Sequence, residues 1–160
     1  MKLFMVEPEV AGEIGERTIY ENYDAIINNG ERPQISYLHF VLMGWLGDDI
    51  LEVTPCFMVS EKLKNVIEES TLTGYAFQDI DISVSEDYSE MYPARELPHF
   101  YRLLPQGVVK VEDETYYAWN NMDFCVTEKF YLVLSENAMK IIRDYQLDNA
   151  DIRELCPKEG

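Results

Sequence analysis

Apolar and polar positions follow the same outline in two stretches of the chain, residues 57–80 and 132–155. The two align without a gap at an offset of 75 residues. Each begins with an apolar run and Ser-Glu, continues with helical spacing up to a leucine, and closes after a polar break with a second apolar segment. Few of the aligned residues are identical, so the similarity of the two stretches rests mainly on the shared pattern of apolar and polar positions. The identical pairs are Ser60 and Ser135, Glu61 and Glu136, Ile67 and Ile142, and Leu72 and Leu147.

In both stretches the pattern predicts a strand, then a helix, then a second strand. A serine, Ser60 or Ser135, precedes each helical segment and suits the N-cap position. The glutamate that follows each serine favours the positive N-terminal end of a helix. Apolar residues recur three and four positions apart, as they do on one face of a helix. They are Leu63, Val66 and Ile67 in the first stretch and Ala138, Ile141 and Ile142 in the second.

The closing strands are less regular than the helices. After Gly74, the segment YAFQDIDISV alternates apolar and polar positions imperfectly. The second stretch ends with Ile152 and Leu155, after a break at Asp148-Asn149. Residues 156–160, CPKEG, predict a frayed tail.

The rest of the chain predicts further strands, loops and one short helix. KLFMV and QISYLHFVLMGW are rich in apolar, β-branched and aromatic residues and predict strands, whereas residues 7–16 predict a loop. RTIYENYDAIINNGERP predicts a short helix that Asn29-Gly30 ends. A long irregular connection is expected from residue 86, and VVKVEDETYYAW then predicts a strand or a hairpin with Asp113 near its turn.

The chain of 160 residues is long enough to bury a core, and no segment has the length or composition of a linker between domains. We therefore expect residues 1–160 to form a single α+β domain. In it, two similar strand-helix-strand units pack on a largely antiparallel or mixed sheet.

Acidic residues outnumber basic ones by 30 to 13, which gives a formal net charge of −17. No basic residue lies between Lys64 and Arg95, or between Lys110 and Lys129. Such a surface repels nucleic acid and anionic membranes, and it attracts a basic partner and speeds its association. A general charge for solubility is the plainer alternative.

Cysteine usage and hydropathy indicate a cytoplasmic protein. Cys56, Cys125 and Cys156 are odd in number and show no C-x-x-C spacing, so we expect reduced thiols. No apolar run approaches the roughly 18 residues of a membrane span. The N-terminal segment also lacks the apolar region of a signal peptide.

The chain offers no motif that indicates catalysis or metal binding. His39 lies in an apolar run that favours a structural role, and His99 has no partner at ligand spacing. A G-x-S-x-G motif, a P-loop and a dinucleotide fingerprint are all missing from the sequence. Asp48 and Asp49 lie at a predicted turn without the ligand spacing of an EF-hand. We expect no catalytic residue, no cofactor and no metal.

Three segments resemble the Imm11 immunity proteins of bacterial polymorphic toxin systems. They are GWLGDDILEVTPCFMVSEKLKNVIEESTLTGYAFQDIDI, ELPHFYRL and NNMDFCVTEKFYLVLSENAMKIIRDYQLDNADI, within residues 44–155. The shared features are a Gly-Asp-Asp segment before a strand, the strand-Ser-Glu-helix unit, a Leu-Pro stretch, an Asp-Phe step and a second unit like LVLSE. Residues 1–43 lie outside the resemblance, and we expect this part to vary with the partner.

The resemblance implies a protein that binds and neutralises a cognate toxin domain and carries no catalytic residues. The negative charge fits a basic toxin, for example a nuclease. We expect contacts from acids in the segments without bases, with two interleaved tyrosines as anchors. The expected contact residues are Asp48, Asp49, Asp79, Asp81, Glu86, Asp87, Tyr88, Glu90 and Tyr92.

Two other functions stay open. A small acidic enzyme would require a concave pocket that holds carboxylates of raised pKa. A structural or regulatory module would form homodimers through an exposed strand edge. Homodimers are also compatible with the immunity function, whereas direct contacts with nucleic acid or a membrane are not expected.

Overall fold

Strands dominate the regular structure of this protein, whose computed structural model describes residues 1–96 and 99–159. The sheets contain both antiparallel and parallel strand pairs, and short helices lie beside them. The prediction of an α+β fold with a mixed sheet is therefore confirmed.

Within the described residues, the largest sheet has seven strands and pairs the first strand of the chain with the last one. The first strand lies at its centre, antiparallel to both of its neighbours. In order, the strands are β11 (Gly107–Val108), β14 (Phe124–Val126), β15 (Leu132–Ser135), β1 (Leu3–Glu7), β16 (Asp151–Pro157), β13 (Thr115–Tyr117) and β12 (Lys110–Glu112).

A second sheet of four strands is antiparallel throughout. Its order is β6 (Ile50–Val53), β7 (Cys56–Ser60), β10 (Phe100–Pro105) and β8 (Tyr75–Gln78). A smaller sheet contains β2 (Gly12–Ile14), β5 (His39–Leu42) and β9 (Asp81–Val84), and β3 (Ile19–Tyr20) pairs with β4 (Ile35–Tyr37).

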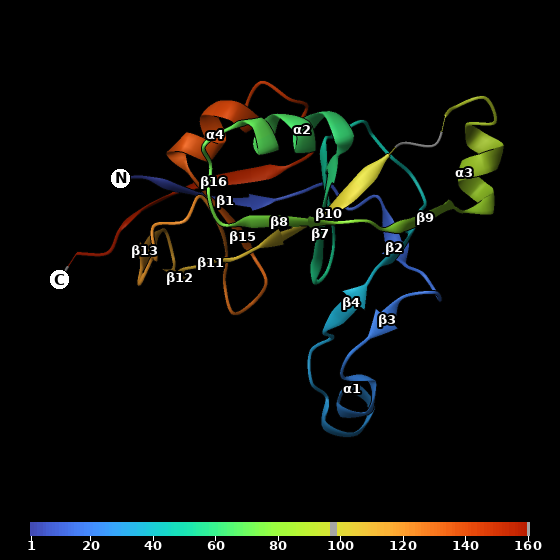
Figure 1. Cartoon of the computed structure of the whole chain (residues 1–160), viewed down its shortest axis with the longest axis horizontal. Helices are drawn as coiled ribbons and strands as arrows, with labels where there is room; N and C mark the ends of the chain where they lie inside the picture. The colour runs from blue at the N-terminus through green and yellow to red at the C-terminus, as the bar shows by residue number, and fades with distance from the viewer. Residues whose placement is uncertain (97–98, 160) are drawn as a thin grey trace.

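Two helices, α2 (Glu61–Glu69) and α4 (Glu136–Ile142), lie side by side above the two larger sheets (Figure 1). Their buried residues pack with apolar side chains of both sheets in one core cluster, which includes Leu63, Ile67, Ala138, Ile142 and, from the strands, Phe4, Phe57, Leu103 and Phe124. Ser60 and Ser135 accept hydrogen bonds from the N–H groups of Leu63 and Ala138. The two predicted N-caps are confirmed.

The middle strands of the two larger sheets occupy corresponding places. β10 lies between β7 and β8, and β1 lies between β15 and β16. Phe100 lies opposite Ser60 in one sheet, and Leu3 lies opposite Ser135 in the other. Each middle strand therefore begins opposite a helix-capping serine, although neither is adjacent in the chain to the strands beside it.

Several predicted segments divide differently in the structure. QISYLHFVLMGW forms β4 and β5, which are interrupted at Leu38, and YAFQDIDISV forms β8 and β9 in different sheets. Residues 12–14, predicted as loop, form β2, because they pair with β5. Residues 86–91, predicted as irregular, form α3 (Glu86–Met91) behind the N-cap Ser85. β16 extends to Pro157, so a strand includes the start of the expected tail.

An arm formed by β3, α1 (Tyr23–Asn29) and β4 projects from the body of the molecule (Figure 1). Gly30 ends α1 with a left-handed conformation, φ 65°, as the Asn-Gly pair predicted. No residue of α1 is buried. The predicted hairpin at β12 and β13 is also confirmed, with Asp113 at φ 54° in its turn.

Candidate functional site

Asp48 and Asp49, which we expected on the partner-binding surface, are buried instead. Their exposed fractions are 0% and 2%. The Asp48 carboxylate accepts hydrogen bonds from the backbone N–H and the side-chain amide of Asn149, at 2.9 and 3.0 Å. Because a buried charge requires such partners, both carboxylates belong to the interior of the fold. The expectation is wrong for these two residues.

Asp49 joins the start of α2 to the segment that follows α4. Its carboxylate accepts hydrogen bonds of 2.8 Å from the Ser60 hydroxyl and from the Gln146 backbone N–H. Lys62 Nζ lies 3.5 Å from the same carboxylate. The Asp49 N–H donates in turn to the Gln146 carbonyl, and the Ser60 N–H donates to the Asp49 carbonyl.

Asp123 makes the corresponding contacts at the other helix. Its Oδ1 accepts from the Ser135 hydroxyl at 2.5 Å, and its Oδ2 accepts from the Thr73 backbone N–H at 2.8 Å. The Asp123 N–H donates to the Thr73 carbonyl, and the Ser135 N–H donates to the Asp123 carbonyl. Each aspartate therefore holds the capping serine of one helix and the segment after the other helix. Each serine hydroxyl is fully engaged and is not a free nucleophile.

Glu9 is a third buried carboxylate, with an exposed fraction of 5%. It accepts hydrogen bonds from the N–H groups of Leu46 and Asp48, at 2.8 and 3.3 Å. Burial raises the pKa of Glu9, and these two hydrogen bonds oppose the shift. Burial also raises the pKa of Glu52, which lines the same open hollow as Glu9. Backbone N–H groups bind both oxygens of Glu9 and fix this carboxylate within the fold.

Four of the expected contact residues are exposed acids that form no ion pair in the described part of the chain: Asp79, Glu86, Asp87 and Glu90. Asp79 follows β8, and the other three lie on α3. The base-free pattern of the sequence therefore corresponds to a solvent-exposed acidic surface at α3.

The two expected tyrosine anchors lie deeper than the acids. Tyr88 is only 2% exposed and belongs to a core cluster, so the expectation that it contacts a partner is wrong for this structure. Its hydroxyl is buried and has no hydrogen-bond partner among the described residues. Tyr92 is half-buried, 5.2 Å from the Tyr88 ring between centroids, and the Arg95 guanidinium lies 5.0 Å from its ring.

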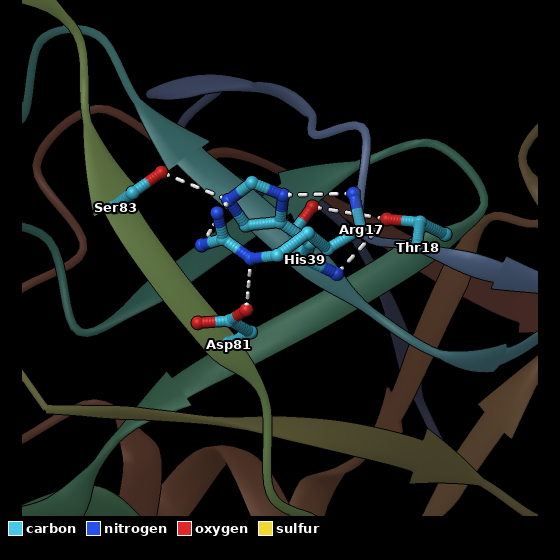
Figure 2. A network of polar contacts seen from close by, with 5 residues as sticks. All are labelled: Arg17, Thr18, His39, Asp81 and Ser83. Carbon is cyan, nitrogen blue, oxygen red and sulfur yellow. Dashed lines mark hydrogen bonds and ion pairs between the residues drawn. The ribbon is translucent and has the colours of Figure 1, made fainter.

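Asp81 is already paired with a cation (Figure 2). Arg17 Nε donates to Asp81 Oδ2 at 2.5 Å, and this hydrogen bond lowers the pKa of Asp81. Asp81 is also less exposed than the acids of α3. Its charge therefore holds the chain before β3 against β9 and contributes less to the outward negative field.

His39 lies at the centre of the same group, with an exposed fraction of 3% (Figure 2). Its Nδ1 accepts a hydrogen bond from the Arg17 backbone N–H at 3.2 Å. Its Nε2 lies 2.8 Å from the Ser83 hydroxyl and 3.0 Å from Arg17 Nη2. Thr18 Oγ1 accepts from the His39 backbone N–H at 2.9 Å.

This arrangement does not activate Ser83 as a nucleophile. Nε2 faces both the Arg17 Nη2 donor and the Ser83 hydroxyl, so an unprotonated Nε2 accepts from Arg17, whereas a protonated Nε2 donates to Ser83. A general base for Ser83 would need a free lone pair on Nε2. A Cβ at Gly15 would lie 2.1 Å from Nδ1, so only glycine fits beside the ring. His39 thus connects β5, β9 and the segment before β3, in agreement with its expected structural role.

An open hollow of about 670 Å³ lies at the N-terminus of α2, with Asp49, Ser60, Lys62 and His99 in its lining. His99 Nδ1 lies 3.2 Å from a Glu61 carboxylate oxygen, and both side chains are more than half exposed. The pair is therefore screened by solvent.

Cys56 and Cys125 are buried, and burial raises the pKa of each thiol to about 11, whereas Cys156 is exposed. Across residues 1–96 and 99–159, no three His, Cys, Asp or Glu side chains gather where they could hold a metal ion. None of the helices described is long and apolar enough to cross a membrane.

Comparison of the chain with known protein families, with curated proteins and with solved structures found no match. The resemblance to the Imm11 immunity proteins therefore rests on the sequence pattern alone.

Several residues that hold this part of the fold together carried no expectation from the sequence, among them Glu9, Arg17, Ser83 and Asp123. Asp123 left a signal, because it directly precedes an apolar strand twelve positions before a capping serine, as Asp49 does at eleven. The sequence contains no such signal for Arg17 and Ser83, because their partner His39 is distant in the chain.

Proposed function

We propose that the protein is a non-catalytic binding protein that neutralises a cognate toxin domain of basic charge. The observation that carries the proposal is the group of exposed acids on α3, Glu86, Asp87 and Glu90, without a cationic partner in the described residues. The resemblance to the Imm11 immunity proteins supplies the class of partner. A basic partner would also gain in association rate from the net charge of −17.

The surface at α3 suits a protein partner. α3 lies at one end of the molecule, apart from α2 and α4 (Figure 1). Met91, at its end, is 64% exposed and offers an apolar contact beside the acids. Protein interfaces combine such apolar contacts with a charged rim.

The arm offers a second surface of the same character. Ile19, Tyr23 and Ile27 are 57%, 59% and 63% exposed. No basic residue lies between Arg17 and Arg32, and these two are engaged within the molecule, with Asp81 and with the Glu128 carbonyl. The arm also carries the exposed acids Glu21, Asp24 and Glu31, which form no ion pair in the described residues. Exposed apolar side chains next to such acids favour a partner that is both basic and apolar. A second copy of this chain fits poorly, because its net charge is also −17.

We also infer that the chain contains two equivalent units, one formed by β7, α2 and β8 and the other by β15, α4 and β16. Their middle strands are exchanged: β1, which precedes the first unit in the chain, lies in the second unit, and β10, which precedes the second unit, lies in the first. Three observations support this: the 75-residue offset of the sequence pattern, the matching registers of β1 and β10, and the reciprocal contacts of Asp49 and Asp123. If the units are equivalent, matched substitutions in them should both lower stability through the same contacts, by amounts that follow the burial of each residue.

The first experiment is a pull-down of the tagged protein from its own cells at low and moderate salt, followed by mass spectrometry. We expect one dominant partner with a basic domain, retained in larger amount at low salt than at moderate salt. Retention of neutral or acidic partners only would contradict the proposal. A mass that doubles with concentration in the absence of any partner would favour the homodimer alternative.

Charge reversal then locates the surface. Glu86→Lys/Glu90→Lys/Asp87→Lys should lower the association rate of the captured partner by about tenfold or more, with an unchanged circular dichroism spectrum. The matched control reverses three other exposed acids, Glu69, Asp144 and Asp148, and changes the net charge equally. Equal loss in both variants would show that total charge, rather than α3, governs association.

A further inference from the structure

We propose that a hollow on the seven-stranded sheet binds a small ligand with two or more negatively charged oxygen atoms, from phosphate or carboxylate groups. The hollow has a volume of about 350 Å³, which lies within the range of ligand pockets. Its lining comes from β1 and β16, from the β12–β13 hairpin and from residues 127–131, which connect β14 to β15. Met5 lines it and belongs to a different core cluster from Phe4 and Val6, which pack towards the helices.

Three cationic side chains line the hollow from three separate parts of the chain: Lys110, Lys129 and Arg153. None of them lies within 4.0 Å of a carboxylate in the part of the chain that the structure describes. The one hydrogen bond found there for the Arg153 guanidinium is weak, from Nη2 to the Met5 sulfur at 3.8 Å. The chain has 30 acidic residues that could pair with these cations. Because none does so in the described part of the chain, the three side chains are available to bind an anion from outside.

The residues that line the hollow carry a small positive formal charge, although the whole chain is strongly negative. Two acids, Asp113 and Glu128, also line it, so the formal charge of the lining is three positive against two negative, or +1. The whole chain carries −17. The Glu128 carbonyl accepts a hydrogen bond of 2.5 Å from Arg32, which holds the backbone of Glu128 towards the arm.

The lining defines the chemistry of the ligand. An arginine fork binds two oxygens of a phosphate or carboxylate at once, and lysines add point charges. Tyr117 and Tyr131 line the hollow and are 41% and 38% exposed. Their hydroxyls can donate to an oxyanion, and their rings can cover an apolar part of the ligand.

The test is an amide NMR titration of the full chain with pyrophosphate and, separately, with citrate, at constant ionic strength. We expect saturable shifts confined to β12–β13, residues 127–131 and Arg153, and the ratio of the two affinities distinguishes phosphate from carboxylate ligands. Lys110→Gln/Arg153→Gln should weaken binding by about tenfold or more. The control Lys140→Gln/Arg143→Gln removes the same charge from the region of α4 and should change it by less than about twofold.

Two results would overturn the proposal. Shifts that do not saturate with either probe would show that the hollow is not a site. Equal weakening of probe binding in the two double variants would show that the probes are attracted to any cationic side chain on the surface and are not bound in the hollow. If Lys110→Gln/Arg153→Gln loses its dispersed spectrum, Lys129→Gln alone replaces it, and unchanged affinity in that variant would likewise overturn the proposal.

Discussion

Replacing Asp49 with alanine should destabilise the fold more than any single change at the acidic surface. The carboxylate, whose side chain is 3% exposed, accepts two hydrogen bonds of 2.8 Å, from Ser60 and from Gln146. Hydrogen bonds to charged groups contribute about 1.5–3 kcal/mol each, so we expect a loss of about 3–6 kcal/mol. Lys62 is 68% exposed, and its ion pair adds little. The loss is a large share of the roughly 5–15 kcal/mol that stabilises a domain.

Urea unfolding, followed by circular dichroism, measures this loss as a shift of the midpoint at constant slope. Asp123→Ala should cost less, about 2–3 kcal/mol, because Asp123 is only half-buried. Asp79→Ala, at an exposed acid, is the control and should change stability by less than about 0.5 kcal/mol. A loss below about 1 kcal/mol for Asp49→Ala would refute the structural role assigned to this carboxylate, and with it the comparison of the two units.

Two further predictions concern buried or paired polar groups. Tyr88→Phe should leave stability unchanged or raise it by about 1 kcal/mol, because it removes a buried hydroxyl that has no hydrogen-bond partner in the described residues and keeps the ring. Thermal unfolding measures this change in stability. A clear loss of stability would mean that the hydroxyl forms a hydrogen bond. The Arg17 guanidinium lowers the pKa of Asp81, so the pair stabilises the fold at pH values above the ordinary aspartate range, and its contribution is lost as the pH falls through the lowered pKa. Arg17→Gln should return the pKa of Asp81 towards its ordinary range in an NMR titration, and an unchanged value would contradict the pairing.

Local features of the fold were predictable because they depend on residues only a few positions apart. The caps at Ser60 and Ser135, the apolar faces of α2 and α4, the left-handed Gly30 and the turn at Asp113 all follow from short-range spacing and backbone preference. The same short range explains the errors. Periodicity does not reveal that YAFQDIDISV divides between two sheets, since its partners β10 and β5 are distant in the chain.

The candidate sites depend on long-range contacts. Acidity and base-free segments were read correctly from the sequence, but whether an aspartate faces solvent depends on what covers it. Residues 146–149, about a hundred positions later in the chain, cover Asp48 and Asp49. Glu86 and Glu90, in contrast, are exposed in the described structure. The hollow with Lys110, Lys129 and Arg153 likewise exists only once β12, β16 and the β14–β15 connection meet.

The sequence by itself determined the net charge, the helix caps and the recurring outline at an offset of 75 residues. The tertiary structure alone decided which acids are exposed, which cations converge and where β1 and β10 insert. The physical reason is that charge and capping are properties of residues and their close neighbours. Exposure and convergence are properties of chain segments that only hydrogen-bonded sheets and a shared core bring together.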